Sequence, residues 1–171
     1  MKLPADIQAR LDTLRQALPG VAAFAVVDGA QFELTTGERL RTAPGLHPVF
    51  FRTPEQKVFF AGPWLVEPTL VPLDHARALH DCPALEQQAP VLSWIVSALD
   101  LPTLLDALRE RLNVELPDGG VALLRYWDPR VLFPAVATMS QSQRNDFLSP
   151  VIEWLAMVNG RRAWLEGAAH A

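Results

Sequence analysis

Three features that many proteins depend on are scarce in this chain: cysteine, long apolar runs and charge of one sign. Its 171 residues include a single cysteine, Cys82, so no disulfide can form within the chain. The longest fully apolar run covers residues 21–27, and a membrane-spanning helix needs ~20 apolar residues. Charged residues also interrupt the N-terminus before a secretory signal could form. We therefore expect a cytoplasmic protein with no membrane partner.

The charge balance argues against a nucleic-acid partner. Fifteen basic and 19 acidic residues give a formal net charge of −4, and the arginines are spread through the chain without forming a run. A protein that binds a phosphate backbone usually presents a basic face. We therefore expect no nucleic-acid partner.

Motifs for catalysis and cofactor binding are also missing. The four histidines form no H-E-x-x-H pattern, one cysteine excludes C-x-x-C zinc sites, and no glycine-rich nucleotide-binding loop or nucleophile elbow is present. The closest approach to a nucleophile cluster is His80-Asp81-Cys82. Adjacent side chains point in different directions, so these three cannot form a triad among themselves. We predict no catalytic residue, no metal, no cofactor and no enzyme activity.

What the chain does contain is enough apolar residues for one core. Half of its residues are hydrophobic, and its length fits one domain. Short apolar runs alternate with segments of helical periodicity, which is typical of the α/β class. We predict a single α/β domain with a central, mostly buried β-sheet flanked by helices. Residues 1–20 form an N-terminal helix of this domain, residues 21–158 its main body, and residues 159–171 a short C-terminal extension.

Capping and turn residues place the individual elements. Helices are predicted over residues 5–18 and 74–88, from Pro102, from Pro129 after a cap at Asp128, and from Ser140 to about Val158 with a kink at Pro150. Strands are predicted over residues 21–27, 57–60, 64–66, 91–98, 121–127 and 163–165. Residues 30–56 are expected to form loops with at most short elements, and residues 117–120 a turn.

Residues 123–132 contain the most informative segment of the chain. Arg125 would lie inside an apolar strand, where its guanidinium needs a carboxylate or several carbonyl groups. Asp128 is the nearest candidate, and Asp28 or Glu153 would serve if the fold brought either one close. We interpret the ion pair as structural, fixing the strand to the helix that follows. The predicted structural signature comprises Arg125, Trp127, Asp128 and Arg130.

The same segment also suggests a surface that faces a partner protein. Arginine, tyrosine and tryptophan are enriched at interface hot spots. For the apolar residues near the C-terminus, core packing is an equally good explanation. The candidate partner-binding residues are Tyr126, Phe133, Trp154, Leu155 and Trp164.

The sequence resembles the adaptor family of type VI secretion effector chaperones, a domain of unknown function encoded beside VgrG. The most specific match is Leu-Arg-Tyr-Trp-Asp-Pro-Arg-Val-Leu at 124–132, which follows Pro-Asp-Gly at 117–119. Weaker matches precede and follow it in the right order, so the resemblance covers roughly residues 21–158. They lie at 26–30, 62–66, 90–97, 104–112, Gln143 and Trp154. Family members often carry a helix after the Asp-Gly turn, whereas residues 32–56 here read as a loop. Many members also have a C-terminal lobe, and this sequence ends soon after Trp164.

The resemblance implies an adaptor without catalysis. Such a protein binds a toxin, usually near its N-terminal or membrane-inserting part, and promotes its loading onto the VgrG spike. It remains in the cytoplasm. The implied partners are therefore a type VI secretion effector and VgrG, and the implied mechanism is shielding of apolar surface on the effector until transfer.

Two alternatives remain open at this level. One is a generic interaction domain, for example an immunity-type protein that neutralises a toxin. The other is a small metal-dependent hydrolase that uses Asp28 and Asp128. Both aspartates follow apolar strands, whose carboxyl ends are common ligand positions in α/β sheets. A turn aspartate at 28 and a helix cap at 128 explain the same residues without a metal.

Overall fold

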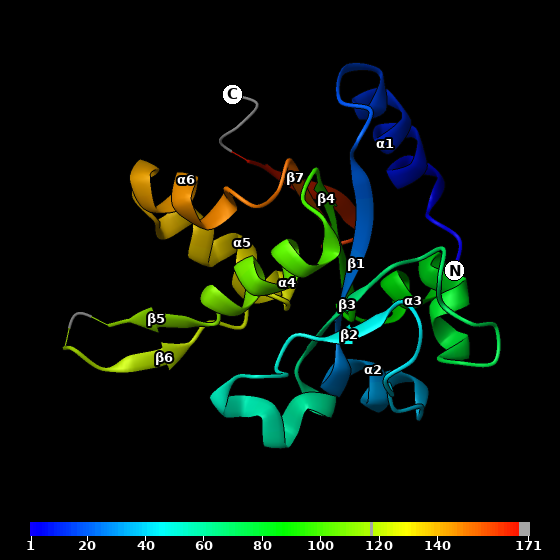
Figure 1. Cartoon of the computed structure of the whole chain (residues 1–171), viewed down its shortest axis with the longest axis horizontal. Coiled ribbons are helices and arrows are strands. Elements are labelled where there is room, and N and C mark those ends of the chain that lie inside the picture. Colours follow the sequence, from blue (N-terminus) through cyan, green and yellow to red (C-terminus); the bar gives the residue numbers. More distant parts are fainter. Residues whose placement is uncertain (117, 168–171) are drawn as a thin grey trace.

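Six strands form one antiparallel sheet in the computed structural model, which describes residues 1–116 and 118–167 (Figure 1). Their order across the sheet is β2-β3-β1-β4-β7-β8, and each neighbouring pair is antiparallel. The strands are β1 (Ala22–Asp28), β2 (Leu46–Pro48), β3 (Pro63–Val66), β4 (Leu92–Ser97), β7 (Glu153–Val158) and β8 (Arg161–Glu166). The predicted α/β class with a central sheet is confirmed.

Helices cover both faces of this sheet, which explains why β1 and β4 are mostly apolar and buried along almost their whole length. Alternate β1 residues serve the two cores: Ala25 and Val27 pack on one face, and Phe24 and Val26 on the other. The first face is covered by α1 (Ala5–Ala17), α2 (Gly29–Thr36) and α3 (Cys82–Gln88). The opposite face is covered by α4 (Leu101–Glu110), α5 (Pro129–Thr138) and α6 (Gln141–Leu148). The domain therefore has three layers with a core on each side of the sheet.

A separate two-stranded hairpin stands out from this body. It consists of β5 (Asn113–Glu115) and β6 (Val121–Leu123), which pair only with each other. The hairpin follows α4 and projects at the left of the molecule (Figure 1). We refer to β5 and β6 as the arm. Of the turn predicted at residues 117–120, residue 117 lies outside the described residues.

Several predicted elements are confirmed, and local signals explain them. Helix 5–18, strand 21–27, strand 64–66, strand 91–98 and edge strand 163–165 correspond to α1, β1, β3, β4 and β8. Asp128 and Ser140 are the N-caps of α5 and α6, and Ser140 forms the predicted capping box with Gln143. The segment after residue 159 is part of the same sheet, because β8 pairs with β7.

Five predicted assignments were wrong or incomplete, and four of them are local. Residues 29–36 form helix α2, so the chain has the helix after the Asp-Gly turn that the resemblance called for. Residues 57–60 lie in a 3-10 helix, η1 (Pro54–Ala61). The helix predicted over 74–88 is divided into η2 (Arg77–Asp81) and α3, and the cap of α3 is Asp81. The predicted strand over 121–127 ends at Leu123.

The largest error concerns the segment after Pro150. The helix predicted to continue through Val158 ends at Leu148, and residues 153–158 form β7. Proline breaks the helix, and the apolar residues beyond it fill a sheet position buried on both faces. Within the described residues, no helix is both long and apolar enough to cross a membrane.

Candidate functional site

The Arg125 guanidinium lies between the N-termini of two helices. Asp28 caps α2, because its Oδ1 accepts the Gln31 N–H at 3.0 Å. Asp128 caps α5 and accepts the Arg130 N–H at 3.0 Å. Nη2 of Arg125 lies 3.1 Å from Oδ2 of Asp28 and 3.7 Å from Oδ2 of Asp128. One side chain thus links two helix caps, and the cap on α2 is 97 positions away in sequence.

The two carboxylates differ in their electrostatic environment. Burial raises the pKa of Asp28, and the opposing effects of the Gln31 N–H and of Arg125 are smaller. Burial also acts to raise the pKa of Asp128, but the hydrogen bonds and charge of Arg130 outweigh it and hold the pKa below its usual value. Arg130 donates from Nε and Nη2 to Asp128 at 3.0 and 2.9 Å. Asp128 is therefore the carboxylate more strongly held in its charged form.

The setting of Arg125 differs from the predicted one. Arg125 follows the end of β6, and 45% of its side chain is exposed, whereas the Asp28 side chain is fully buried. Glu153, the third proposed partner, binds Arg10 instead. The ion pair between residue 125 and an aspartate is present, but the buried member is the carboxylate rather than the arginine.

Asp28 and Asp128 do converge, as the metal alternative required, but they converge on a cation. The guanidinium of Arg125 supplies the positive charge that a divalent ion would otherwise bring to the two carboxylates. Over residues 1–116 and 118–167, no group of three or more His, Cys, Asp or Glu side chains is placed to hold a metal ion. The geometry fits an ion-pair cluster better than a metal site.

Tyr126 and Trp127 anchor the end of the arm in the core. Both side chains are buried, and the Tyr126 hydroxyl donates to the Leu108 carbonyl of α4 at 2.9 Å. The Trp127 ring packs edge-on against Phe50, with 5.5 Å between ring centroids. The polypeptide leaving β6 is therefore fixed by two buried aromatic rings and by the Arg125 ion pairs.

The five candidate partner-binding residues fall into two groups. Tyr126, Trp154 and Leu155 are buried core residues, and the Trp154 indole donates to Ser93 at 2.9 Å. They present almost no surface in the folded chain. Phe133 is partly buried in the second core, whereas Trp164 on β8 is 59% exposed.

A second ion-pair cluster joins α1 and α3 to the C-terminal hairpin. Arg162 of β8 donates to Asp6 at 2.8 Å and to Glu86 at 2.8 Å. Glu86 is buried and also accepts from the Trp94 indole at 3.0 Å. No motif in the sequence indicates this cluster, because its members are 76 to 156 positions apart.

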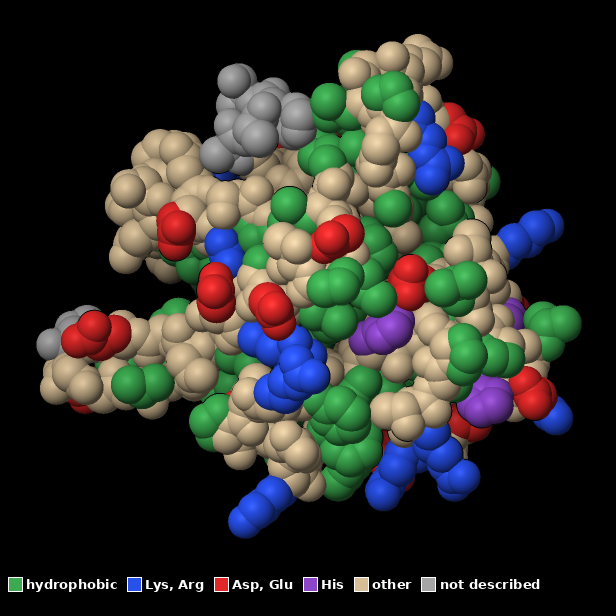
Figure 2. All heavy atoms as spheres, in the orientation of Figure 1, with side chains coloured by type: hydrophobic (Ala, Val, Ile, Leu, Met, Phe, Trp, Pro, Cys, Tyr) green, Lys and Arg blue, Asp and Glu red, His purple; other side chains and the backbone are tan. Residues whose placement is uncertain are grey.

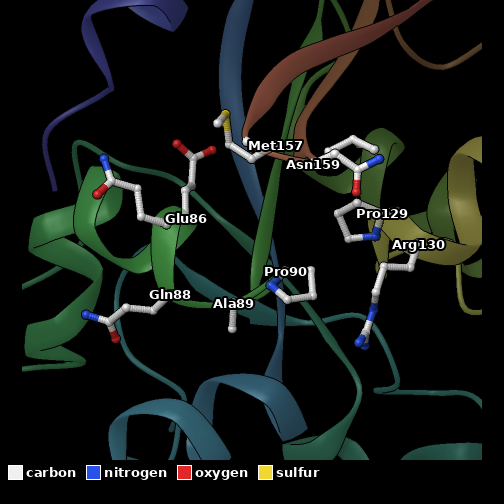
Figure 3. Close-up of a pocket in the computed structure, with 11 residues that line it drawn as sticks. Glu86, Gln88, Ala89, Pro90, Pro129, Arg130, Met157 and Asn159 are labelled. Atoms are coloured by element: carbon white, nitrogen blue, oxygen red, sulfur yellow. The ribbon is translucent and has the colours of Figure 1, made fainter.

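A cavity of about 570 Å³ lies beside both clusters. Glu86 and Arg130 lie on opposite sides of it, with Pro90 and Pro129 between them (Figure 3). Both charged side chains already have partners, Arg162 for Glu86 and Asp128 for Arg130. The chemistry of this lining therefore does not indicate a particular ligand.

Exposed apolar side chains gather on the arm. Val121 is 71% exposed and Leu123 is 40% exposed. Being two residues apart on one strand, they project from the same face of the hairpin. Leu116, next to the turn, is also exposed. At the base of the arm, a cavity of about 210 Å³ lies between β5 and α6 and is lined in part by Val114, Met139 and Phe147.

The fold is a three-layer α/β domain. The ion pairs of Arg125 with Asp28 and Asp128 connect parts of this domain to one another. The model of the family described as a domain of unknown function, DUF4123, matches residues 23–146. This match covers most of the chain, and the chain belongs to that family. It spans β1 through most of α6, including the arm, and leaves β7 and β8 outside. No curated protein and no solved structure matches the chain.

Proposed function

We propose that this chain is a cytoplasmic adaptor that binds a type VI secretion effector and promotes its loading onto the VgrG spike. The resemblance of residues 21–158 to effector chaperones motivates the proposal, and membership of the DUF4123 family is compatible with it. The chain would act through its surface and would not catalyse a reaction.

The observation that supports this function best is the exposed apolar face of the arm. A two-stranded hairpin is only marginally stable by itself and gains little from exposing Val121 and Leu123 to water. In the space-filling view the arm extends away from the body of the molecule (Figure 2). Apolar side chains on a projecting element are available to cover apolar surface of another protein.

The base of the arm carries a second apolar surface on the other face of the hairpin, because Val114 pairs with Ala122 and points away from Val121 and Leu123. Val114 and Met139 line the cavity between β5 and α6, with Glu110, Arg111 and Asp146 at its margin. An apolar floor with a charged rim suits an amphipathic segment, whose apolar side enters the groove while its polar side faces the rim. We propose that an apolar segment of the effector lies against the arm and this groove.

The Arg125 cluster would serve this function indirectly. It fixes the residues that follow β6 to the N-termini of α2 and α5, so that the arm leaves the body in a defined direction. A rigidly held arm loses less conformational entropy on binding than a flexible one. In this proposal the two aspartates position the arm and do not bind a metal.

The test is co-expression with the effector encoded beside VgrG in the same genome. The double substitution Val121→Asp and Leu123→Asp places two charges on the apolar face, and we expect at least a tenfold loss of effector retained in a pull-down. The control is Leu34→Asp, which places a charge on a leucine of α2 that is 80% exposed. The control should retain the effector.

Secretion supplies a second readout. Cells that carry the double aspartate variant should secrete less effector, whereas control cells should secrete normal amounts. Equal retention and secretion by both variants would rule out the arm as the effector site. If the chain instead protects cells from the toxin without affecting secretion, it is an immunity protein.

A further inference from the structure

The sheet has two edges, and they differ in length and in proline content. The β2 edge is three residues long and ends in Pro48, and short length and proline both discourage further pairing. The β8 edge is six residues long and contains no proline. Within residues 1–116 and 118–167, β8 pairs only with β7.

The turn before β8 determines which of its backbone groups are free. Asn159 and Gly160 both have positive φ angles and form a two-residue hairpin turn, which makes Val158 and Arg161 a hydrogen-bonded pair. Consistently, the N–H of Gly167 donates to Ile152 at 2.9 Å. Odd-numbered residues of β8 therefore bond to β7, and the N–H and C=O groups of the even-numbered residues point outward. Those residues are Arg162, Trp164 and Glu166.

The order of side chains along this edge is self-complementary. The strand begins with arginines and ends with Glu166, and the exposed Trp164 lies midway between Arg162 and Glu166. An antiparallel copy centred on Trp164 places Arg162 of each chain, which also binds Asp6 and Glu86 of its own chain, opposite Glu166 of the other. Moving the centre to Ala163 or Leu165 loses this pairing of opposite charges. Cross-strand pairs of opposite charge stabilise a sheet, and like charges destabilise it.

We propose that β8 pairs with β8 of a second copy of this chain, so that two six-stranded sheets join into one continuous sheet across a twofold axis at Trp164. The two tryptophan side chains lie side by side on one face, and each covers exposed surface of the other. On the opposite face, Ala163 meets Leu165 of the second copy. Such an interface is isologous and closes after two copies.

This dimer is independent of the proposed adaptor function. β8 lies outside residues 23–146, which the family model matches, whereas the arm lies inside them. A dimer formed through β8 leaves both arms available to other proteins.

Sedimentation velocity of the full chain, from about 1 to 100 μM, tests the proposal over the range of weak to moderate association. The wild-type chain should become dimeric within this range. Glu166→Pro removes an outward N–H that β7 does not use, so the variant should fold normally but remain monomeric. Glu166→Arg places arginines opposite each other and should also weaken dimerisation at least tenfold. Glu166→Ala, the matched control, keeps the N–H and should retain most of the association.

Circular dichroism melts confirm that each variant is folded. If Glu166→Pro fails to fold, Glu166→Arg at the same exposed position supplies the answer. A wild-type chain that stays monomeric at 100 μM overturns the proposal. So does a dimer that persists unchanged in the folded Glu166 variants, because it must use another surface.

Discussion

The two β-hairpins of this protein differ in length and in surroundings. The C-terminal hairpin, β7–β8, adds to the edge of the central sheet, and its first strand is buried on both faces. The arm, β5–β6, pairs only with itself and exposes its apolar residues. The buried side chains of β7 make the C-terminal hairpin part of the core, whereas the exposed side chains of the arm are available for binding. The difference predicts that equivalent substitutions in the two hairpins have very different effects on stability.

The largest effect is expected at Trp154 in β7. Trp154→Ala removes a buried ring that packs on Tyr126 and Phe147, and it leaves the Ser93 hydroxyl without its indole partner. We expect the free energy of unfolding to fall by about 3 to 5 kcal/mol. Urea denaturation followed by circular dichroism measures this change. A loss below 1 kcal/mol would mean that β7 is not the core strand described here.

The next effect concerns the cap that holds the base of the arm. Asp128→Ala removes the N-cap of α5 and the partner of Arg125 and Arg130, and we expect a loss of about 2 to 3 kcal/mol. The control is Asp100→Ala, which removes the N-cap of α4. Asp100 is exposed and takes no part in the ion pairs described above. The control should lose clearly less stability in the same urea titration.

The pH dependence of these variants distinguishes the two carboxylates. The folded-state pKa of Asp128 is lowered, so its contribution is present above the unfolded pKa, near 4, and disappears as the pH falls through the folded value. The stability gap between wild type and Asp128→Ala should therefore shrink in acid.

The pKa of Asp28 is raised, so its contribution to stability is present at low pH and is lost as the pH rises through the folded value. The free energy of unfolding of Asp28→Asn, compared with that of wild type, should therefore increase as the pH rises. Parallel trends for both residues would contradict this assignment.

A smaller effect is expected at Arg125. Asp28 is fully buried, but the half-exposed guanidinium leaves room for water to replace it, so Arg125→Ala should cost about 1 to 2 kcal/mol. Hydrogen exchange of β5 and β6 amides should accelerate, because the substitution loosens the base of the arm. Arg39→Ala breaks a surface ion pair with Glu33, far from the arm in sequence, and should leave arm exchange unchanged. Unchanged arm exchange in Arg125→Ala would show that the aromatic anchors suffice.

The smallest effect is expected on the arm itself. Val121→Ser combined with Leu123→Ser alters side chains that water already contacts, so stability should change by no more than about 0.5 kcal/mol. A thermal melt suffices to measure this. A loss comparable to that of Trp154→Ala would mean that the arm packs against the body in solution, and the contrast between the two hairpins would disappear.

Local signals in the sequence determined the helix caps, most turns and several central elements. Asp128, Ser140 with Gln143, and the apolar run in β1 act over one to four residues, so their effects could be predicted without the fold. The same reasoning placed an ion pair at Arg125, because a guanidinium in apolar surroundings needs a carboxylate. The α/β class followed from the alternation of apolar runs and helical periodicity.

Tertiary structure alone decided the choices in which local preference was ambiguous. Residues 153–158 are apolar enough for a helix or a strand, and the open edge beside β4 made them a strand. Asp28 became the nearest partner of Arg125 only because the tertiary fold brings the end of β1 beside the residues that follow β6. Sequence patterns record interactions along the chain, whereas pairs such as these depend on contacts between residues far apart in sequence.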